Sequence, residues 1–272
     1  MFFGHGTDNA RDEAASLVYH VLGLPHDSPP RALRRHATAA ELARLETVLK
    51  RRIDERIPLP YLIHEAWFAG LPFYVDERVL IPRSPFAELI ANRFSPWIDP
   101  GRVTRALDLG TGSGCIALAM AKAFPRARVD GSDVDRQALD VAHINRRRLR
   151  LTRRVRLIES DHFAALSGES YDIIASNPPY VGKREMRGLP SEYRHEPRHA
   201  LESGPQGLDS VEIILREAAK YLRPRGLLVV EVGNTERVLR RVYPRVPFTW
   251  LEFERGGGGV FLLTREQLMQ RG

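Results

Sequence analysis

The sequence of 272 residues contains little cysteine, little lysine and no long apolar run. Its one cysteine, Cys115, excludes an intrachain disulfide framework and is typical of a reducing cytosol. No apolar stretch approaches ~20 residues, the length that crosses a bilayer, and residues 1–8 lack the basic and apolar regions of a signal peptide. No low-complexity tract is present. We therefore expect a globular, cytoplasmic protein that does not bind membranes.

Lysine supplies only four of the 41 basic side chains, so arginine carries most of the positive charge. The formal net charge is +7, and residues 1–70 hold nine basic and nine acidic side chains, so the surplus lies in residues 71–272. Much of it is in two arginine runs, 146–150 and 153–156. Such runs bind RNA phosphates, but they are also common at solvated helix ends. Charge alone leaves both interpretations open.

Helix caps and apolar spacing predict a small helical domain over residues 1–70. Three helix starts carry capping residues: Asp8 or Asn9 for a helix over residues 8–23, Ser28 before Pro29 and Pro30, and Thr38 with Glu41 for the helix after it. The last of these helices then shows apolar residues at helical spacing, namely Leu42, Leu45, Leu49 and Ile53. Because its charge is balanced, this domain suits recognition of a protein substrate.

Residues 71–98 are predicted to form a linker between this domain and the rest of the chain. A short helix over residues 61–68, ended by Gly70, leads into it. We expect a β-hairpin from residues 71–75 and 79–81, followed by a helix that starts at Ser84-Pro85. Arg83 lies on a stiff, proline-flanked connector, where an exposed position and a position facing a pocket are both open.

Residues 99–272 alternate between strand and helix patterns, which predicts an α/β fold with a doubly wound, mainly parallel sheet. The expected strands cover residues 106–109, 129–133, 156–159, 171–176, 226–233, 248–253 and 260–263. The last two flank a glycine-rich turn and are expected to form an antiparallel hairpin at the edge of the sheet.

A glycine-rich turn, Gly110-Thr111-Gly112-Ser113-Gly114, follows the first of these strands. Glycines allow close approach of a ligand, and the start of the following helix offers free N–H groups. The spacing is G-x-G-x-G and not the dinucleotide pattern G-x-G-x-x-G, and no Lys-Ser/Thr follows as in a triphosphate-binding loop. Asp108, in the preceding strand, favours a ligand with an ammonium group over a pyrophosphate.

Two later acidic positions extend this interpretation. Asp133 ends the second strand 19 residues beyond Gly114, where a carboxylate typically binds ribose hydroxyls. Asp161, next to His162 and Phe163, follows the third strand, where it could border an adenine ring. A ligand with an amino-acid end, a ribose and an adenine but no phosphate is S-adenosylmethionine.

The tetrapeptide Asn177-Pro178-Pro179-Tyr180 follows the fourth strand. Asn177 offers a side-chain carbonyl and Pro178 a backbone carbonyl, and the prolines fix φ and remove competing N–H donors. Tyr180 adds a flat ring against which a planar group can lie. This arrangement suits an amide or an exocyclic amine, although asparagine and proline also mark ordinary turns.

Two further features are ambiguous. The segment 195–199 has the H-E-x-x-H pattern, which binds zinc only when one helix presents both histidines. Pro197 lies between the histidines in a loop-like context, so we expect no metal site. Glu231, near the end of the fifth strand, either orients groups of the pocket or pairs with an arginine.

With these motifs, the chain resembles the class I S-adenosylmethionine-dependent methyltransferases, and more narrowly the HemK/PrmB family of protein glutamine methyltransferases. The connector 79–90 and the segments 4–10 and 65–68 are similar to the branch that acts on large-subunit ribosomal protein three. The resemblance covers nearly the whole chain. His162 departs from the family, in which a larger aromatic or apolar residue is frequent at this position.

The resemblance implies methylation of a glutamine side-chain amide at N5 in that ribosomal protein, free or in an assembling ribosome. Asn177 and the Pro178 carbonyl would hold the two amide N–H groups. The residues expected to carry the transfer are Asn177, Pro178, Pro179 and Tyr180. The residues expected to bind S-adenosylmethionine are Asp108, Gly110, Thr111, Gly112, Ser113, Gly114, Asp133, Asp161, His162 and Asn177.

Two other functions fit parts of the sequence. A nucleic-acid amino-methyltransferase would use the same tetrapeptide on adenine, but an enzyme that flips a DNA base normally carries a target-recognition module. A contact with ribosomal RNA stays open because of the arginine runs. A non-catalytic, cofactor-binding assembly factor would not need the intact tetrapeptide.

Overall fold

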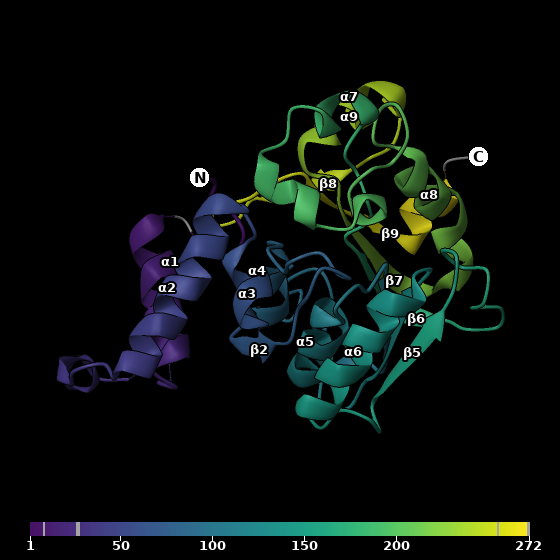
Figure 1. Cartoon of the computed structure of the whole chain (residues 1–272). Helices are drawn as coiled ribbons and strands as arrows, with labels where there is room; N and C mark the ends of the chain where they lie inside the picture. Colours follow the sequence, from purple (N-terminus) through teal and green to yellow (C-terminus); the bar gives the residue numbers. More distant parts are fainter. Residues whose placement is uncertain (8, 26–27, 255, 271–272) are drawn as a thin grey trace.

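A seven-stranded sheet forms the centre of the computed structural model, which describes residues 1–7, 9–25, 28–254 and 256–270 (Figure 1). The strands are β3 (Arg105–Leu109), β4 (Arg128–Asp133), β5 (Val155–Glu159), β6 (Tyr171–Ser176), β7 (Leu222–Glu231), β8 (Thr249–Trp250) and β9 (Val260–Thr264). Their order is β5-β4-β3-β6-β7-β9-β8, in which the first five are parallel and β9 is antiparallel to both β7 and β8. The expected mainly parallel sheet with an antiparallel edge is confirmed, although β8 is shorter than predicted.

Helices cover both faces of this sheet. The helices on one face are α4 (Phe86–Ala91), α5 (Cys115–Ala123) and α6 (Arg136–Arg148), and those on the other are α8 (Asp209–Tyr221) and α10 (Arg265–Met269). Strand side chains alternate between the two layers: Ile173 and Ala175 pack in the α5 layer, and Ile174 packs in the α8 layer. Burial on both sides explains why these strands are continuous apolar runs. The remaining short elements are α7 (Lys183–Met186), α9 (Glu236–Val242), η1 (Pro30–Arg34), η2 (Pro100–Arg102), η3 (Ser191–His195), η4 (Arg198–Ala200) and η5 (Gly233–Thr235).

The amino-terminal part contains three helices, α1 (Ala10–Val21), α2 (Ala39–Asp54) and α3 (Leu59–Ile63). Asn9 caps α1 as expected, whereas the alternative cap, Asp8, lies outside the described residues. Thr38 and Glu41 form the expected capping box at the start of α2. The apolar stripe of α2 is only partly buried, because Leu42, Leu49 and Ile53 are 50%, 40% and 50% exposed.

The predicted position of the hairpin in the linker is wrong. α3 ends at Ile63, and the pair that forms is β1 (Ala66–Phe68) with β2 (Leu71–Phe73), so the helix predicted over residues 61–68 is also too long. Ala69 and Gly70 both have positive φ (48° and 74°), as the central residues of a tight hairpin turn require. Residues 79–81 form no strand; Val79 and Ile81 are instead buried against α6 and Tyr61.

Buried ion pairs attach the helical part to the rest of the molecule. The Arg52 guanidinium, 3% exposed, donates to Glu13 Oε1 at 2.7 Å and to Glu192 Oε1 at 3.2 Å. Glu192 also accepts from the Phe2 N–H at 2.9 Å. Because Glu192 lies in the segment that follows residues 177–180, the first 70 residues are joined directly to the loop beside the candidate site.

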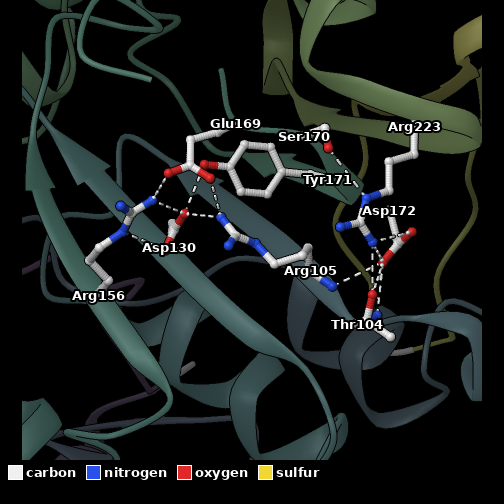
Figure 2. A network of polar contacts seen from close by, with 9 residues as sticks. All are labelled: Thr104, Arg105, Asp130, Arg156, Glu169, Ser170, Tyr171, Asp172 and Arg223. Atoms are coloured by element: carbon white, nitrogen blue, oxygen red, sulfur yellow. Dashed lines mark hydrogen bonds and ion pairs between the residues drawn. The ribbon is translucent and has the colours of Figure 1, made fainter. Parts of the chain in front are cut away.

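A second polar network joins the amino-terminal ends of all five parallel strands (Figure 2). Asp130 of β4 accepts from Tyr171 Oη at 2.8 Å and from Arg156 Nη2 at 2.7 Å. Asp172 of β6 accepts from the Arg105 N–H at 2.9 Å and from Arg223 Nη1 at 3.1 Å. Arg105 and Arg156 also share Glu169. The network therefore uses part of the positive charge of the chain for structure.

Candidate active site

A cavity that opens to solvent lies at the carboxyl ends of β3, β4 and β6. This is the point at which strand order reverses, where parallel sheets typically bind ligands. The predicted site residues that line it are Gly110, Thr111, Gly112, Ser113, Asp133, Asp161, His162, Asn177, Pro178 and Pro179. Asp108, Gly114 and Tyr180 are not among its lining residues.

The glycine turn forms one wall of the cavity because of its backbone conformation. Gly110 and Gly112 have φ of +76° and +52°, and a Cβ added at either would meet no atom within 4 Å. Gly114 has φ of +81°, but its Cβ would lie 3.2 Å from Ala142 Cβ. The first two glycines therefore leave space for a ligand, whereas Gly114 allows α5 and α6 to pack closely.

Asp133 holds the turn and faces the cavity. Its Oδ2 accepts from the Gly112 N–H at 2.8 Å, and its Oδ1 accepts from the Asp135 N–H at 2.9 Å. Burial raises its pKa, although these two N–H bonds counteract the shift. Each carboxylate oxygen has a second lone pair, so Asp133 retains acceptors for the hydroxyl groups of a ribose.

Asp108 lies behind the turn and is fully buried. Its Oδ2 accepts from Thr111 Oγ1 at 2.6 Å and from the Ala117 N–H at 2.9 Å, and its Oδ1 has no partner among the described residues. Burial raises the pKa of Asp108 to about 7. The geometry makes Asp108 an organiser of the turn and the start of α5; the predicted contact with a ligand ammonium group would have to use the orphaned Oδ1.

Asp161 and His162 also line the cavity. His162 adopts the left-handed region (φ 47°), held by Ser160 Oγ, which donates to the His162 carbonyl at 2.8 Å. His162 Nδ1 is 2.7 Å from Asp161 Oδ1. The Asp161 side chain is 75% exposed at the rim. The pair places an imidazole and a carboxylate where the sequence predicts an adenine, and that role stays a prediction.

Strand register places the tetrapeptide beside the glycine turn. Leu109 pairs with Ser176, and Ser176 Oγ donates to the Leu109 carbonyl at 2.7 Å, so Gly110 and Asn177 follow neighbouring strand ends. Asn177, Pro178 and Pro179 line the same cavity as residues 110–113. The acceptor-rich turn and the glycine turn therefore share one space.

Tyr180 occupies a different position from the one predicted. Its hydroxyl donates to Glu231 Oε1 at 3.2 Å, and a Cβ added at Gly233 would lie 2.6 Å from its ring. The ring thus packs against the Gly233 backbone and supports the turn from behind. Of the two interpretations of Glu231, the structure supports orientation of the site, since Glu231 Oε2 also accepts from Ser84 Oγ at 2.5 Å.

The connector of residues 78–84 forms part of the cavity wall, a position that the sequence left open for Arg83 and did not indicate for the other residues. Arg83 makes a bidentate ion pair with Glu196, at 2.5 and 2.7 Å, and Glu196 also accepts from the Ile81 N–H at 3.1 Å. Burial opposes ionisation of Glu196, but His5 and Arg83 lower its pKa to about 2. The proline-flanked sequence was the available signal for this rigid wall.

The H-E-x-x-H segment supplies Glu196, the partner of Arg83, but it does not bring its two histidines together. His195 Nε2 lies 2.9 Å from the Glu55 carbonyl, and His199 Nε2 lies 3.0 Å from Asp135 Oδ2. The two histidines belong to separate turns, η3 and the following η4. Across residues 1–7, 9–25, 28–254 and 256–270, no group of three histidine, cysteine or acidic residues could hold a metal ion. In the same ranges, no helix is both long and apolar enough to cross a membrane.

Comparisons with known proteins show which family and fold the chain resembles. The family model for the methyltransferase small domain matches residues 88–243. A protein of Neisseria meningitidis named ribosomal protein uL3 glutamine methyltransferase is 52% identical over 99% of this chain and 89% of its own length. A protein of Xanthomonas campestris with the same name is 48% identical over 99% and 87%. The crystal structure of a methyltransferase from Pyrococcus furiosus shares the fold, with a TM-score of 0.53 and 18% identity, over 84% of this chain and 99% of that one.

Proposed function

The chain belongs to the methyltransferase small-domain family and, within it, to the ribosomal protein uL3 glutamine methyltransferases; from this we propose that it methylates the side-chain amide nitrogen, N5, of a glutamine in uL3. Its cofactor is S-adenosylmethionine. The observation that carries the N5 proposal is the shared cavity of residues 110–113 and 177–179. A cytoplasmic location is part of the proposal.

The residues present fit this cofactor. The open space over Gly110 and Gly112, the free acceptor sites of Asp133 and the orphaned Asp108 Oδ1 would hold its amino-acid and ribose parts. Asp161 and His162 would border its adenine. When bound, the cofactor supplies a methyl group on a positively charged sulfur, which is already activated toward a nucleophile.

The protein therefore needs to place the amide nitrogen, and no nucleophilic side chain is required. The Asn177 side-chain carbonyl and the Pro178 carbonyl would each accept one amide N–H, so that the nitrogen lone pair points into the cavity. With the methyl group supplied by the bound cofactor, the amide nitrogen held by Asn177 and Pro178 would have one proton to release, and the cavity's opening would let solvent take it. Hydrogen bonds of ~1 kcal/mol each would not explain the rate, but correct placement contributes about 7–11 kcal/mol.

The direct test is methyl transfer with labelled S-adenosylmethionine to purified uL3, large-subunit ribosomal RNA and DNA in separate reactions. We expect label on uL3, and tandem mass spectrometry should place the added methyl on a glutamine side chain. Label on the nucleic acids alone would contradict the proposal and favour an adenine amino-methyltransferase. Binding of the cofactor with no transfer to any of the three would favour an assembly factor.

We also propose that residues 1–70 recognise uL3, residues 71–98 link the two parts, and residues 99–272 carry the catalytic site. The support is the exposed stripe of Leu42, Leu49 and Ile53 on α2, since large apolar side chains grouped on one helix face typically mark a contact surface. Tight attachment of this part through Arg52 would hold a docked protein at a fixed distance from the cavity.

Replacing the stripe tests this role. The variant Leu42→Ser/Leu49→Ser/Ile53→Ser should raise KM for uL3 about tenfold or more. Full burial of one leucine or isoleucine stabilises a complex by ~1.5–3 kcal/mol, so partial burial of the three together is enough for a tenfold effect. kcat and the affinity for S-adenosylmethionine should change little, since α2 does not line the cavity. Steady-state kinetics and calorimetry separate these quantities. An unchanged KM would exclude this face as the docking surface.

A further inference from the structure

The two arginine runs divide into residues that serve the fold and residues that do not. Arg146 donates to the Val155 carbonyl, Arg154 to the carbonyls of residues 121, 124 and 125, and Arg148 lies 5.1 Å from the Tyr74 ring centroid. Arg156 is held by Asp130 and Glu169. By contrast, the side chains of Arg147, Arg150 and Arg153 are exposed and make no hydrogen bond or ion pair with any described residue.

Three more unpaired cations lie beside them. The Arg154 bonds bring the end of α5 against the loop before β5, and the Val129 N–H donates to the Arg154 carbonyl. Lys122, Arg126 and Arg128 belong to this adjacent segment, and their side chains are likewise exposed and unpaired among the described residues. We call these six residues the basic end: Lys122, Arg126, Arg128, Arg147, Arg150 and Arg153.

No carboxylate neutralises the basic end from its own segments, because residues 121–129 and 141–158 contain no aspartate or glutamate. Of the carboxylates that flank these segments, Asp130 is already paired with Arg105 and Arg156 (Figure 2), and Asp140 and Glu159 make no ion pair with the basic end. Burial, followed by the charges of Arg146 and Arg147, also lowers the pKa of His143, which is consistent with a positive local potential.

We propose that the basic end is a binding surface for the phosphate backbone of RNA. Guanidinium groups bind phosphate oxygens in a bidentate manner, and several on one surface give affinity without reading bases. Arg147, Arg150, Arg153 and Arg154 line one shallow pocket together with Leu151 and Thr152, and no aromatic ring is present there on which a base could stack. The chemistry therefore fits a structured RNA recognised through its backbone.

The position of this surface defines what it could do for the enzyme. The basic end lies at the amino-terminal ends of β4 and β5, whereas the cavity lies at the carboxyl ends of the same sheet. Strands of five or six residues at ~3.3 Å each separate the two by about 17–20 Å. RNA bound here would not enter the active site; it would hold a larger particle. The choice of ribosomal RNA rests on the proposed function, whereas RNA binding itself does not.

Charge reversal tests the proposal on the full-length protein. The variant Arg147→Glu/Arg150→Glu/Arg153→Glu should bind a labelled fragment of large-subunit ribosomal RNA about tenfold more weakly or worse. The slope of log Kd against log salt concentration should fall by about three, because each phosphate contact with a double helix contributes ~0.9 to it. The matched control is Arg237→Glu/Arg241→Glu/Arg245→Glu, which makes the same charge change at exposed, unpaired arginines in and after α9 and should retain most of the affinity.

Methylation assays separate this inference from the proposed function. Both variants should methylate free uL3 at the parental rate, which also shows that they fold, but the first should be slower on uL3 bound to ribosomal RNA. Equal RNA affinity of parent and variant, an equal loss in the control, or equally tight binding of polyglutamate or of anionic vesicles would overturn the RNA surface. Absence of any uL3 methylation by the parent would instead contradict the proposed function and leave the RNA measurement intact.

Discussion

Asn177→Ala should lower kcat for uL3 methylation by about a hundredfold, the effect expected when a reacting group is misplaced by ~1 Å. The substitution removes the side-chain carbonyl that would accept one amide N–H, whereas the Pro178 carbonyl remains. One N–H would then stay fixed while the nitrogen rotates away from its reacting orientation. The cavity wall formed by residues 110–113 does not depend on this side chain.

Calorimetry with S-adenosylmethionine is the second half of this test, because the loss should be in turnover and not in cofactor affinity. Replacement of Asn92, an exposed asparagine after α4 and away from the cavity, is the matched control and should change neither quantity. A large fall in cofactor affinity in Asn177→Ala would show that this residue holds the cofactor and does not position the amide.

Glu231→Ala should lower kcat about thirtyfold, because it removes two hydrogen bonds worth ~1 kcal/mol each that hold Tyr180 and Ser84. Ser84 fixes the connector wall and Tyr180 supports the tetrapeptide, so both sides of the cavity would loosen. Glu231→Gln keeps the shape and can keep both contacts, so it should recover most of the rate. If alanine and glutamine lower kcat equally, the carboxylate does more than position its neighbours.

The pH dependence of Glu231 gives an independent measurement. Burial raises its pKa to about 7, although Ser84 and Tyr180 counteract the shift. A protonated carboxyl, like glutamine, can keep the contacts with both hydroxyls, so activity should change little through pH 7 and the pH profiles of the parent protein and Glu231→Gln should run parallel; a rate that rises through pH 7 in the parent protein alone would show that the charge itself is needed.

The same shift in the pKa of Glu231 predicts how stability depends on pH. A carboxyl whose pKa is raised in the folded state binds more protons than in the unfolded chain between pH ~4.5 and 7. Its contribution is therefore complete below pH ~4.5 and is lost as pH rises through 7. Denaturant unfolding from pH 4 to 8 should show a smaller decline for Glu231→Gln than for the parent protein.

Sequence reasoning succeeded where the signal was local. The capping box at Thr38, the glycine turn at 110–114 and the tetrapeptide after β6 each depend on residues within a few positions of one another. Parallel strand ends then bring the last two together at one edge, since that follows from topology alone.

It failed where distant residues decide the outcome. Tyr180 is turned toward Glu231, 51 residues away, and Ser84 toward the same carboxylate, 147 residues away. The hairpin forms earlier in the chain than predicted, because Val79 and Ile81 are buried against α6 and do not pair with another strand. Periodicity describes which side chains avoid water, but it does not specify which partner covers them.

The network of Asp130, Tyr171 and Arg156 has a consequence for the opposite end of the sheet (Figure 2). Strand side chains alternate with a period of two, so sliding β4 by one position would turn Asp130 into the apolar layer beneath α5. The same slip would move Asp133 along the strand by about 3.3 Å relative to Gly112. The hydrogen bond between them would break, and the carboxylate would no longer lie where it could accept from a ribose. Ion pairs that contact no substrate therefore fix the register of the sheet. A sheet with a shifted register would lose them, and its catalytic residues would be present but wrongly placed.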